Sequence, residues 1–221
     1  MEENASLAVI GGTGNLGYAL AGRWARAGYG IIIGSRSADK AARAADELQA
    51  VDEGTSVEGR SNADAVRAAD VVVLTVPFSA QGATLADIAG AINGKLVVDT
   101  TVPLAPPKVA RVQLPDTGSA ALAARKALGD DARLVSAFHN VAAHKLKQGG
   151  HVDCDILIFG DDPADRDIVV ELAKSAGMRG IHCGPLANSV AAEALTSILI
   201  GINKRYKADG AGIRITGIAD T

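Results

Sequence analysis

The stretch that decides the fold is Gly12-Thr13-Gly14-Asn15-Leu16-Gly17, which follows the apolar run Leu7-Ala8-Val9-Ile10 after a single residue, Gly11. A strand that leads through three glycines into a helix lets the backbone approach a pyrophosphate, with the amides of the helix N-terminus facing the phosphates. The spacing of an amphipathic helix follows at Leu16, Ala19, Leu20 and Trp24. The sequence therefore predicts a Rossmann fold in which Gly12, Thr13, Gly14, Asn15 and Leu16 contact a dinucleotide. The alternative is a glycine turn that binds nothing.

The end of the second apolar strand indicates which dinucleotide is bound. Folds selective for NAD place an acidic residue there to bind the ribose 2′-hydroxyl. Here Ile31-Ile32-Ile33 ends in Gly34-Ser35-Arg36, and Lys40 lies one helical turn beyond Arg36. Arg36 offers a planar fork of donors to a 2′-phosphate, and Ser35 adds a hydroxyl. We therefore expect NADP, bound by Ser35, Arg36 and Lys40, unless the two cations are only solvated charges at a helix start.

Composition limits the class of protein and its partners. The chain has 221 residues, of which 48% are hydrophobic and 3% aromatic, so its core must be aliphatic. The net charge of −3 offers no general basic surface, and we expect neither nucleic acid nor a membrane as a partner. Apolar runs such as Val71–Val76 are far shorter than the roughly 18 residues of a membrane helix. The acidic start Met1-Glu2-Glu3-Asn4 is not typical of a signal peptide, so we expect a cytoplasmic protein.

The cysteines and histidines show no metal-binding pattern. Cys154 and Cys183 form no C-x-x-C pair, and we expect both to be buried packing thiols. None of the four histidines has the spacing of a metal ligand pair. We therefore expect no metal ion.

Apolar runs alternate with helical patterns, which predicts an α/β protein with a doubly wound parallel sheet. The expected strands of the first part are 7–10, 31–33, 56–58, 71–76, 96–98 and 134–137. The expected helices there are 15–27, 39–50, 63–68, 80–92 and 119–128. After about Phe138 the pattern restarts with strands near 155–159 and 180–183, a helix after 162 and a long apolar helix, 190–206. We expect an NADP-binding domain, residues 1–137, and a smaller C-terminal α/β domain, residues 138–221. We expect the long helix to be buried at a domain or subunit interface.

In such a sheet the ligand lies across the carboxyl ends of the strands, so the loops there are the candidates for chemistry. Val76 and Val102 would present backbone groups and apolar surface to a nicotinamide ring. Asn140 is either a hydrogen-bond partner of its carboxamide or a turn former. His139 is the one obvious general acid or base nearby, although a histidine that packs and bonds locally fits equally. We assign no catalytic side chain.

Taken together, these motifs resemble the NADPH-dependent coenzyme F420 reductases. The segments that carry the resemblance are Val9–Gly17, Ile33–Arg36 with Lys40, Thr75–Pro77, Ser136–Val141, Phe159–Asp162 and Gly184–Asn188. One departure is Val141-Ala142-Ala143, where a proline is expected after the apolar residue.

The resemblance implies hydride exchange between the nicotinamide C4 of NADP(H) and the deazaflavin C5 of F420, in a cleft between two domains of a homodimer. Direct transfer between two bound rings needs alignment more than an acid or base. Backbone amides near Asn140, Val141 and Ala142 would then polarise the pyrimidine edge of the deazaflavin. The alternatives are a flavin or ferric reductase of the same architecture and a non-catalytic NADPH sensor.

Overall fold

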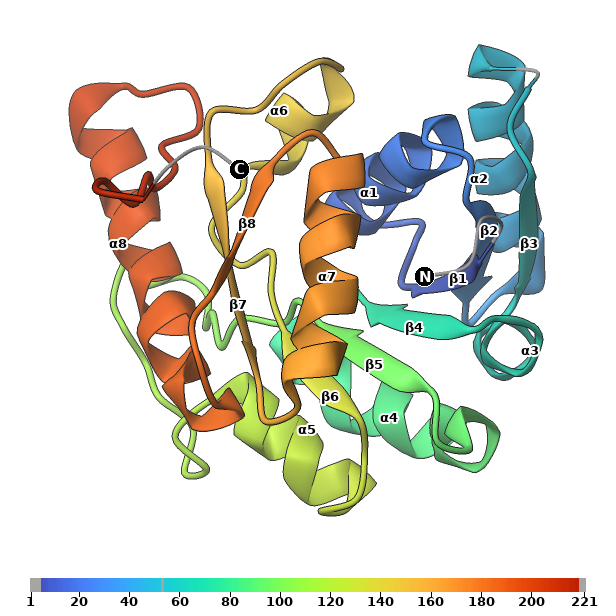
Figure 1. The fold of residues 1–221 in the computed structure, drawn as a ribbon, viewed down its shortest axis with the longest axis horizontal. Coiled ribbons are helices and arrows are strands. Elements are labelled where there is room, and N and C mark those ends of the chain that lie inside the picture. Colours follow the sequence, from blue (N-terminus) through green and yellow to red (C-terminus); the bar gives the residue numbers. More distant parts are fainter. Residues whose placement is uncertain (1–4, 53, 219–221) are drawn as a thin grey trace.

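A computed structural model describes residues 5–52 and 54–218 of the chain. The segment Met1–Asn4, on which the expectation about a signal peptide rests, lies outside the described residues. Within them the chain forms one eight-stranded sheet with helices on both faces (Figure 1). Its strand order is β3-β2-β1-β4-β5-β6-β7-β8. The order reverses between β1 and β4, which is the switch point of a doubly wound sheet.

The observed elements follow the expected ones to within a few residues. The strands are β1 (Ser6–Ile10), β2 (Gly30–Ser35), β3 (Val57–Ser61), β4 (Val71–Leu74), β5 (Leu96–Asp99), β6 (Leu134–Ser136), β7 (Asp155–Gly160) and β8 (Arg179–His182). The helices are α1 (Asn15–Arg26), α2 (Ala38–Val51), α3 (Asn62–Ala68), α4 (Phe78–Ile92), α5 (Ala120–Leu128), α6 (Ala143–Lys147), α7 (Pro163–Ser175), η1 (Leu186–Asn188) and α8 (Ser189–Tyr206). The sequence did not predict α6 or η1, because each is too short to show an apolar period.

One strand pair differs in direction from the expected parallel sheet. Among themselves, strands β1 to β6 all pair in parallel. Strand β7 instead pairs antiparallel with β6, with Val135 opposite Gly160 and Ser136 opposite Phe159. Strand β8 then pairs in parallel with β7. The C-terminal strands thus extend the same sheet. An apolar run shows that a strand exists but not in which direction it pairs.

The sheet is buried on both faces, as continuous apolar strands require. Successive residues of β1 alternate between two apolar clusters. Leu7 and Val9 belong to the cluster beneath α1, α2 and α7, and Ala8 and Ile10 belong to the cluster beneath α3, α4 and α5. This packing fixes α1, and with it the glycine turn, at the carboxyl end of β1.

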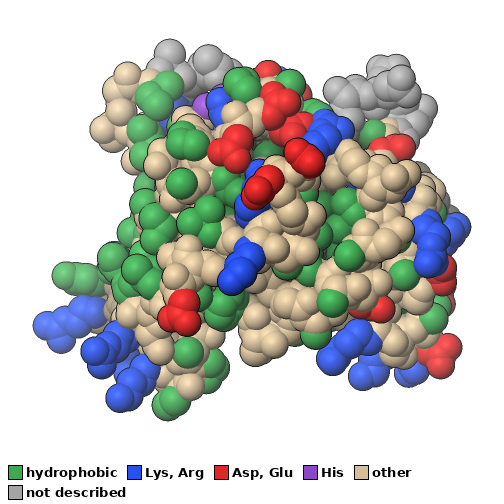
Figure 2. Space-filling view, turned by 90° about the horizontal axis from the view of Figure 1, so that it is seen from below, with side chains coloured by type: hydrophobic (Ala, Val, Ile, Leu, Met, Phe, Trp, Pro, Cys, Tyr) green, Lys and Arg blue, Asp and Glu red, His purple; other side chains and the backbone are tan. Residues whose placement is uncertain are grey.

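Helix α8 is only partly covered by the rest of the described chain, so of the two expected kinds of interface a subunit interface stays open for its exposed side. Ile198, Ile202 and Tyr206 are 49%, 37% and 75% exposed, and Val112 and Leu114 of the loop before α5 are also exposed. Figure 2 shows apolar side chains gathered on the side of the molecule where α8 lies in Figure 1. In the described part of the chain, residues Leu186–Tyr206 are long and apolar enough to cross a membrane by length and composition alone. A helix that packs on another protein passes the same test, so this finding is weak evidence for a membrane.

Candidate functional site

The glycine turn between β1 and α1 has the geometry of a phosphate-binding loop. Gly11 has φ +80°, and the N–H of Gly14 donates to the Gly11 carbonyl at 2.8 Å. A Cβ on Gly17 would lie 2.3 Å from Thr75 Oγ1 and 2.9 Å from the Cα of Gly12, so only glycine allows this approach. Gly14 is the N-cap of α1, and no side chain in the described part of the protein caps the helix. The first amides of α1 therefore remain available to an anion.

A cavity of about 480 Å³ opens beside this turn, and we call it the dinucleotide cavity. Its lining residues come from the loops after β1, β2 and β4 and from the helices α2, α3 and α4. They include six predicted site residues, namely Thr13, Gly14, Ser35, Arg36, Lys40 and Val76.

The cations of this cavity are placed to receive a phosphate. Arg36 and Lys40 are exposed, and neither has an ion-pair partner among the described residues. Ser37, between them, is the N-cap of α2, and its side chain accepts from the Lys40 N–H at 3.4 Å. The positive end of α2 therefore adds to the two side-chain charges.

Asn62 also lines the dinucleotide cavity, and the sequence reasoning missed it. Its side chain is buried, and its Oδ1 has no hydrogen-bond partner among the described residues. The available signal was position, because Asn62 directly follows β3 at the same edge of the sheet as the other loops.

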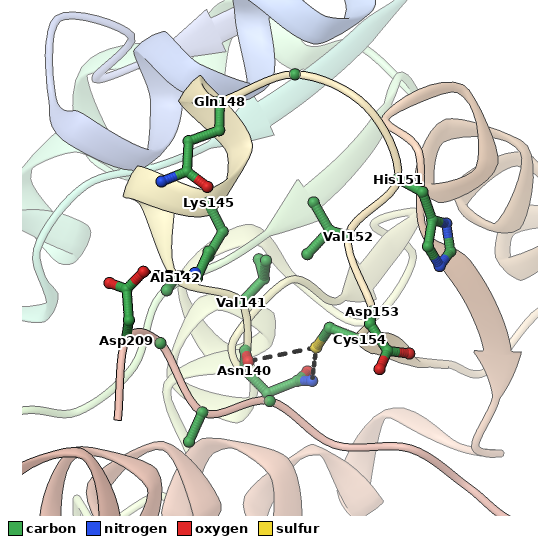
Figure 3. A pocket seen from close by; sticks show the side chains of 14 residues that line it. Asn140, Val141, Ala142, Lys145, Gln148, His151, Val152, Asp153, Cys154 and Asp209 are labelled. Atoms are coloured by element: carbon green, nitrogen blue, oxygen red, sulfur yellow. Dashed lines mark hydrogen bonds and ion pairs between the residues drawn. The ribbon is translucent and has the colours of Figure 1, made fainter. Parts of the chain in front are cut away.

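A second cavity, of about 400 Å³, lies against the loop after β6 (Figure 3). We call it the C-terminal cavity, because residues 140–154 and 209–212 supply its lining. Asn140, Val141 and Ala142, all predicted as site residues, form one wall, and the ion pair between Lys145 and Asp209, 2.5 Å long, borders it. The sequence reasoning did not find Lys145 or Asp209, because they meet only through the fold.

Asn140 is held in place while keeping a free acceptor. Its Nδ2 donates to the Asp155 carbonyl at 2.7 Å and to Cys154 Sγ at 3.2 Å, whereas its buried Oδ1 has no partner among the described residues. The backbone N–H groups of Asn140, Val141 and Ala142 likewise donate to no described residue. Cys154 is buried, as expected, whereas Cys183 is only partly buried because it follows the edge strand β8.

His139 is sealed inside the protein. It is 5% exposed, its Nε2 lies 2.8 Å from Ser136 Oγ, and its carbonyl accepts from Thr196 Oγ1 at 3.0 Å. Burial lowers the pKa of His139 to about 3. The ring is therefore neutral near pH 7, and the geometry is that of a histidine that packs and bonds locally.

Two buried carboxyl groups lie behind these loops. Gln81 donates to Asp99 at 2.6 Å, and burial raises the pKa of Asp99. Glu193 of α8 accepts from the N–H groups of Ala120 and Ala121 at 2.6 and 3.1 Å. Burial raises the pKa of Glu193 to about 7 despite these two donors. Glu193 thus joins α8 to the first turn of α5.

Four predicted site residues line neither cavity: Gly12, Asn15, Leu16 and Val102. Gly12 packs against the backbone of β1, where an added Cβ would lie 2.7 Å from the Val9 carbonyl. Asn15 Oδ1 lies 3.4 Å from Lys147 Nζ, so α6 approaches the start of α1.

Comparison with known proteins decides between the alternatives. Residues 6–103 match the family model described as NADP oxidoreductase, coenzyme F420-dependent. The chain is 41% identical to the F420-dependent NADP reductase of Methanothermobacter thermautotrophicus, over 97% of this chain and 96% of that protein. This chain belongs to the F420-dependent NADP reductase family. It is also 39% identical to the F420-dependent NADP reductase of Methanocaldococcus jannaschii, over 96% of this chain and 98% of that protein.

A solved structure agrees on the fold. The crystal structure of a putative F420-dependent NADP-reductase from Arthrobacter sp. FB24 has a TM-score of 0.81 and 23% identity, and the match covers 96% of this chain and all of that one. As an F420-dependent NADP reductase, the protein is an oxidoreductase that transfers a hydride between NADP(H) and coenzyme F420.

Proposed function

We propose that the dinucleotide cavity holds NADP(H) in this reductase and that the C-terminal cavity holds the deazaflavin end of F420. The residues of the first cavity fit NADP, because the first amides of α1 and two cations that pair with no described residue line the space beside the glycine turn. In this proposal residues 1–137 form the NADP-binding domain, and residues 138–221 complete the cleft.

The observation that supports the second assignment is the set of unpaired polar groups in the loop after β6. Three backbone N–H groups, from Asn140 to Ala142, and the buried Oδ1 of Asn140 have no partner among the described residues. A deazaflavin pyrimidine edge offers both carbonyl oxygens and an N–H, so these groups complement it. Asn140 follows β6 and Val76 follows β4, and both loops lie at the carboxyl edge of the sheet.

The chain's own contribution to the reaction is positioning. When bound, NADPH supplies the hydride at C4 of its nicotinamide. Val76 and Val102 provide apolar surface near that ring, and the N–H groups of the Asn140–Ala142 loop stabilise negative charge on the acceptor. The neutral, buried His139 does not donate a proton in this scheme.

Reciprocal substitutions test the two assignments. Ala142→Phe places a ring in the C-terminal cavity, and we expect the KM for F420 to rise about tenfold or more while the dissociation constant of NADPH stays unchanged. Arg36→Ala is the matched variant of the other cavity and should weaken NADPH alone. An unchanged KM for F420 in Ala142→Phe would place the acceptor elsewhere.

We also propose that two copies of the chain associate through α8. Exposed apolar residues of α8 and of the loop before α5 stand beside one contact point, since Ser197 Oγ, next to Ile198, donates to the carbonyl of Arg111, next to Val112, at 3.5 Å. Such patches mark interfaces. Ile198→Lys combined with Ile202→Lys should convert a dimer into a monomer in light scattering after gel filtration. A monomeric wild-type protein, or one extracted only with detergent, would overturn this proposal.

A further inference from the structure

Arg23, in the last turn of α1, is a buried arginine whose partners are all backbone carbonyls. Only 6% of its surface is exposed. Its Nε donates to Leu146 at 2.7 Å, its Nη1 donates to Gly150 at 2.5 Å and to Ala176 at 2.8 Å, and its Nη2 donates to Lys145 at 3.3 Å. One guanidinium therefore joins α1 to three separate points of the C-terminal half of the chain.

The surroundings of Arg23 indicate that it serves as a donor of several hydrogen bonds and not as one half of an ion pair. No described carboxylate pairs with Arg23, and burial together with the nearby charge of Arg26 lowers its pKa. Burying a charge without a countercharge costs free energy of folding, and a packed apolar side chain at this position would not have that cost. The carbonyls of Lys145, Leu146 and Ala176 lie at the C-terminal ends of α6 and α7, where helices leave acceptors short of donors. The Lys145 carbonyl also accepts from the Gln148 N–H at 3.3 Å. Only a planar fork of donors reaches all of these acceptors at once.

The segment that Arg23 holds is a wall of the C-terminal cavity. Lys145, Gln148 and Val152 line that cavity, and Figure 3 shows the chain between them arching over it. The Val152 N–H donates to the Gly177 carbonyl at 3.0 Å. A Cβ on Gly177 would lie 2.7 Å from Arg23 Nη1, so the glycine leaves room for the guanidinium.

The other end of α1 carries the glycine turn of the dinucleotide cavity. We propose that Arg23 is a positioning residue for hydride transfer, because it fixes the wall of the C-terminal cavity, residues 145–152, to the helix that binds NADP. This inference rests on the proposed assignment of that cavity to F420. Hydride transfer requires alignment of two rings, so a small displacement of one wall lowers the rate steeply.

The first test follows the wall itself, without cofactor. In Arg23→Ala we expect amide hydrogen exchange of residues 145–152 to accelerate about tenfold or more, while the strands β1 to β5 keep their protection. Arg26→Ala is the matched control, because Arg26 is an exposed arginine three residues further along the same helix. Arg23→Lys keeps the positive charge but not the planar fork of donors, and it should show the same local loss of protection. This second variant serves the test if Arg23→Ala folds poorly. Unchanged exchange of residues 145–152 in both variants would overturn the proposal.

The second test separates binding from transfer. We expect Arg23→Ala to lower single-turnover hydride transfer from NADPH to F420 about tenfold or more with an unchanged dissociation constant of NADPH, and Arg26→Ala to change neither. Added guanidinium ion, well below denaturing concentrations, should restore both the rate and the exchange protection of Arg23→Ala, because it can enter the space that the side chain leaves. Faster exchange without slower transfer would show that Arg23 only stabilises the fold. If Ala142→Phe leaves the KM for F420 unchanged, the proposed assignment of the C-terminal cavity to F420 is wrong, and the role of Arg23 falls with it.

Discussion

Arg36 stands at the carboxyl end of β2, exposed and without an ion-pair partner among the described residues. Because a guanidinium binds a phosphate through two charge-assisted hydrogen bonds, Arg36→Ala should weaken NADPH binding by roughly 1.5 to 3 kcal/mol. NADH lacks the 2′-phosphate, so its binding should hardly change. Calorimetric titration of both cofactors checks this. Equal losses for NADPH and NADH would show that Arg36 supports the structure and does not read the phosphate.

The variant His139→Ala tests whether this histidine acts as a general acid. Its pKa of about 3 leaves the ring neutral, and its Nε2 faces Ser136 inside the protein. We therefore expect His139→Ala to lower turnover by less than the roughly 100-fold typical of a lost general acid–base catalyst. The deuterium effect with C4-deuterated NADPH should persist. A larger loss that added imidazole reverses would make His139 catalytic.

For single residues, the sequence predicted positions that are set by the end of a strand. It did not predict contacts between residues that lie far apart in the chain. The prediction that Ser35, Arg36 and Lys40 lie near the glycine turn rested on the end of the second strand, because parallel strands end at one edge of the sheet, and all three line the dinucleotide cavity. Arg23 was not found, because an arginine in an amphipathic helix usually faces solvent. Only the packing of α6 and α7 against α1 turns it inward.

At the scale of elements, the turn from β1 into α1 holds glycines in two different surroundings, one open and one tightly packed. A Cβ on Gly14 would meet only the Gly11 carbonyl, at 3.2 Å, whereas one on Gly17 would collide with Thr75 and Gly12. Gly14→Val should therefore abolish NADP binding with little change in melting temperature, and Gly17→Val should lower the melting temperature itself. Calorimetry and melting curves decide between them. Micromolar NADP affinity in Gly14→Val would remove this turn from the site.

The contact of α8 with α5 should make stability depend on pH. Burial raises the pKa of Glu193 from 4.5 to about 7, so between these values the folded protein binds a proton that the unfolded chain releases. The free energy of unfolding must then fall as pH rises through this window. Relative to Glu193→Gln, which does not titrate, the wild type should lose about 2 to 3 kcal/mol between pH 5 and pH 8 in urea unfolding. A constant difference would mean that the amides of Ala120 and Ala121 keep Glu193 ionised.

The elements themselves were largely predictable, because continuous apolar strands and amphipathic helices have distinct periods. The direction of β7 was not, since it depends on how the loop around α6 turns the chain back. Whether the chain itself or another subunit covers α8 was left open by the sequence, because an apolar helix has the same pattern in both cases.

At the scale of the whole molecule, we propose that the protein aligns two cofactors at one edge of its sheet. In the proposed assignments NADP lies in the cavity beside the glycine turn, F420 lies against the loop after β6, and no side chain is required to transfer a proton. These assignments predict direct transfer, in which the hydrogen leaves one ring and joins the other without exchange with water.

Single-turnover reduction of F420 by C4-deuterated NADPH tests this claim most directly. We expect one F420 to be reduced for each NADPH oxidised, a slower rate with the deuterated cofactor, and the deuterium recovered at C5 of the reduced deazaflavin. Deuterium appearing in water, or reduction of a flavin or ferric acceptor with F420 left unchanged, would contradict the account. Stoichiometric NADPH binding with no turnover on any acceptor would contradict it as well, because the protein would then be a sensor.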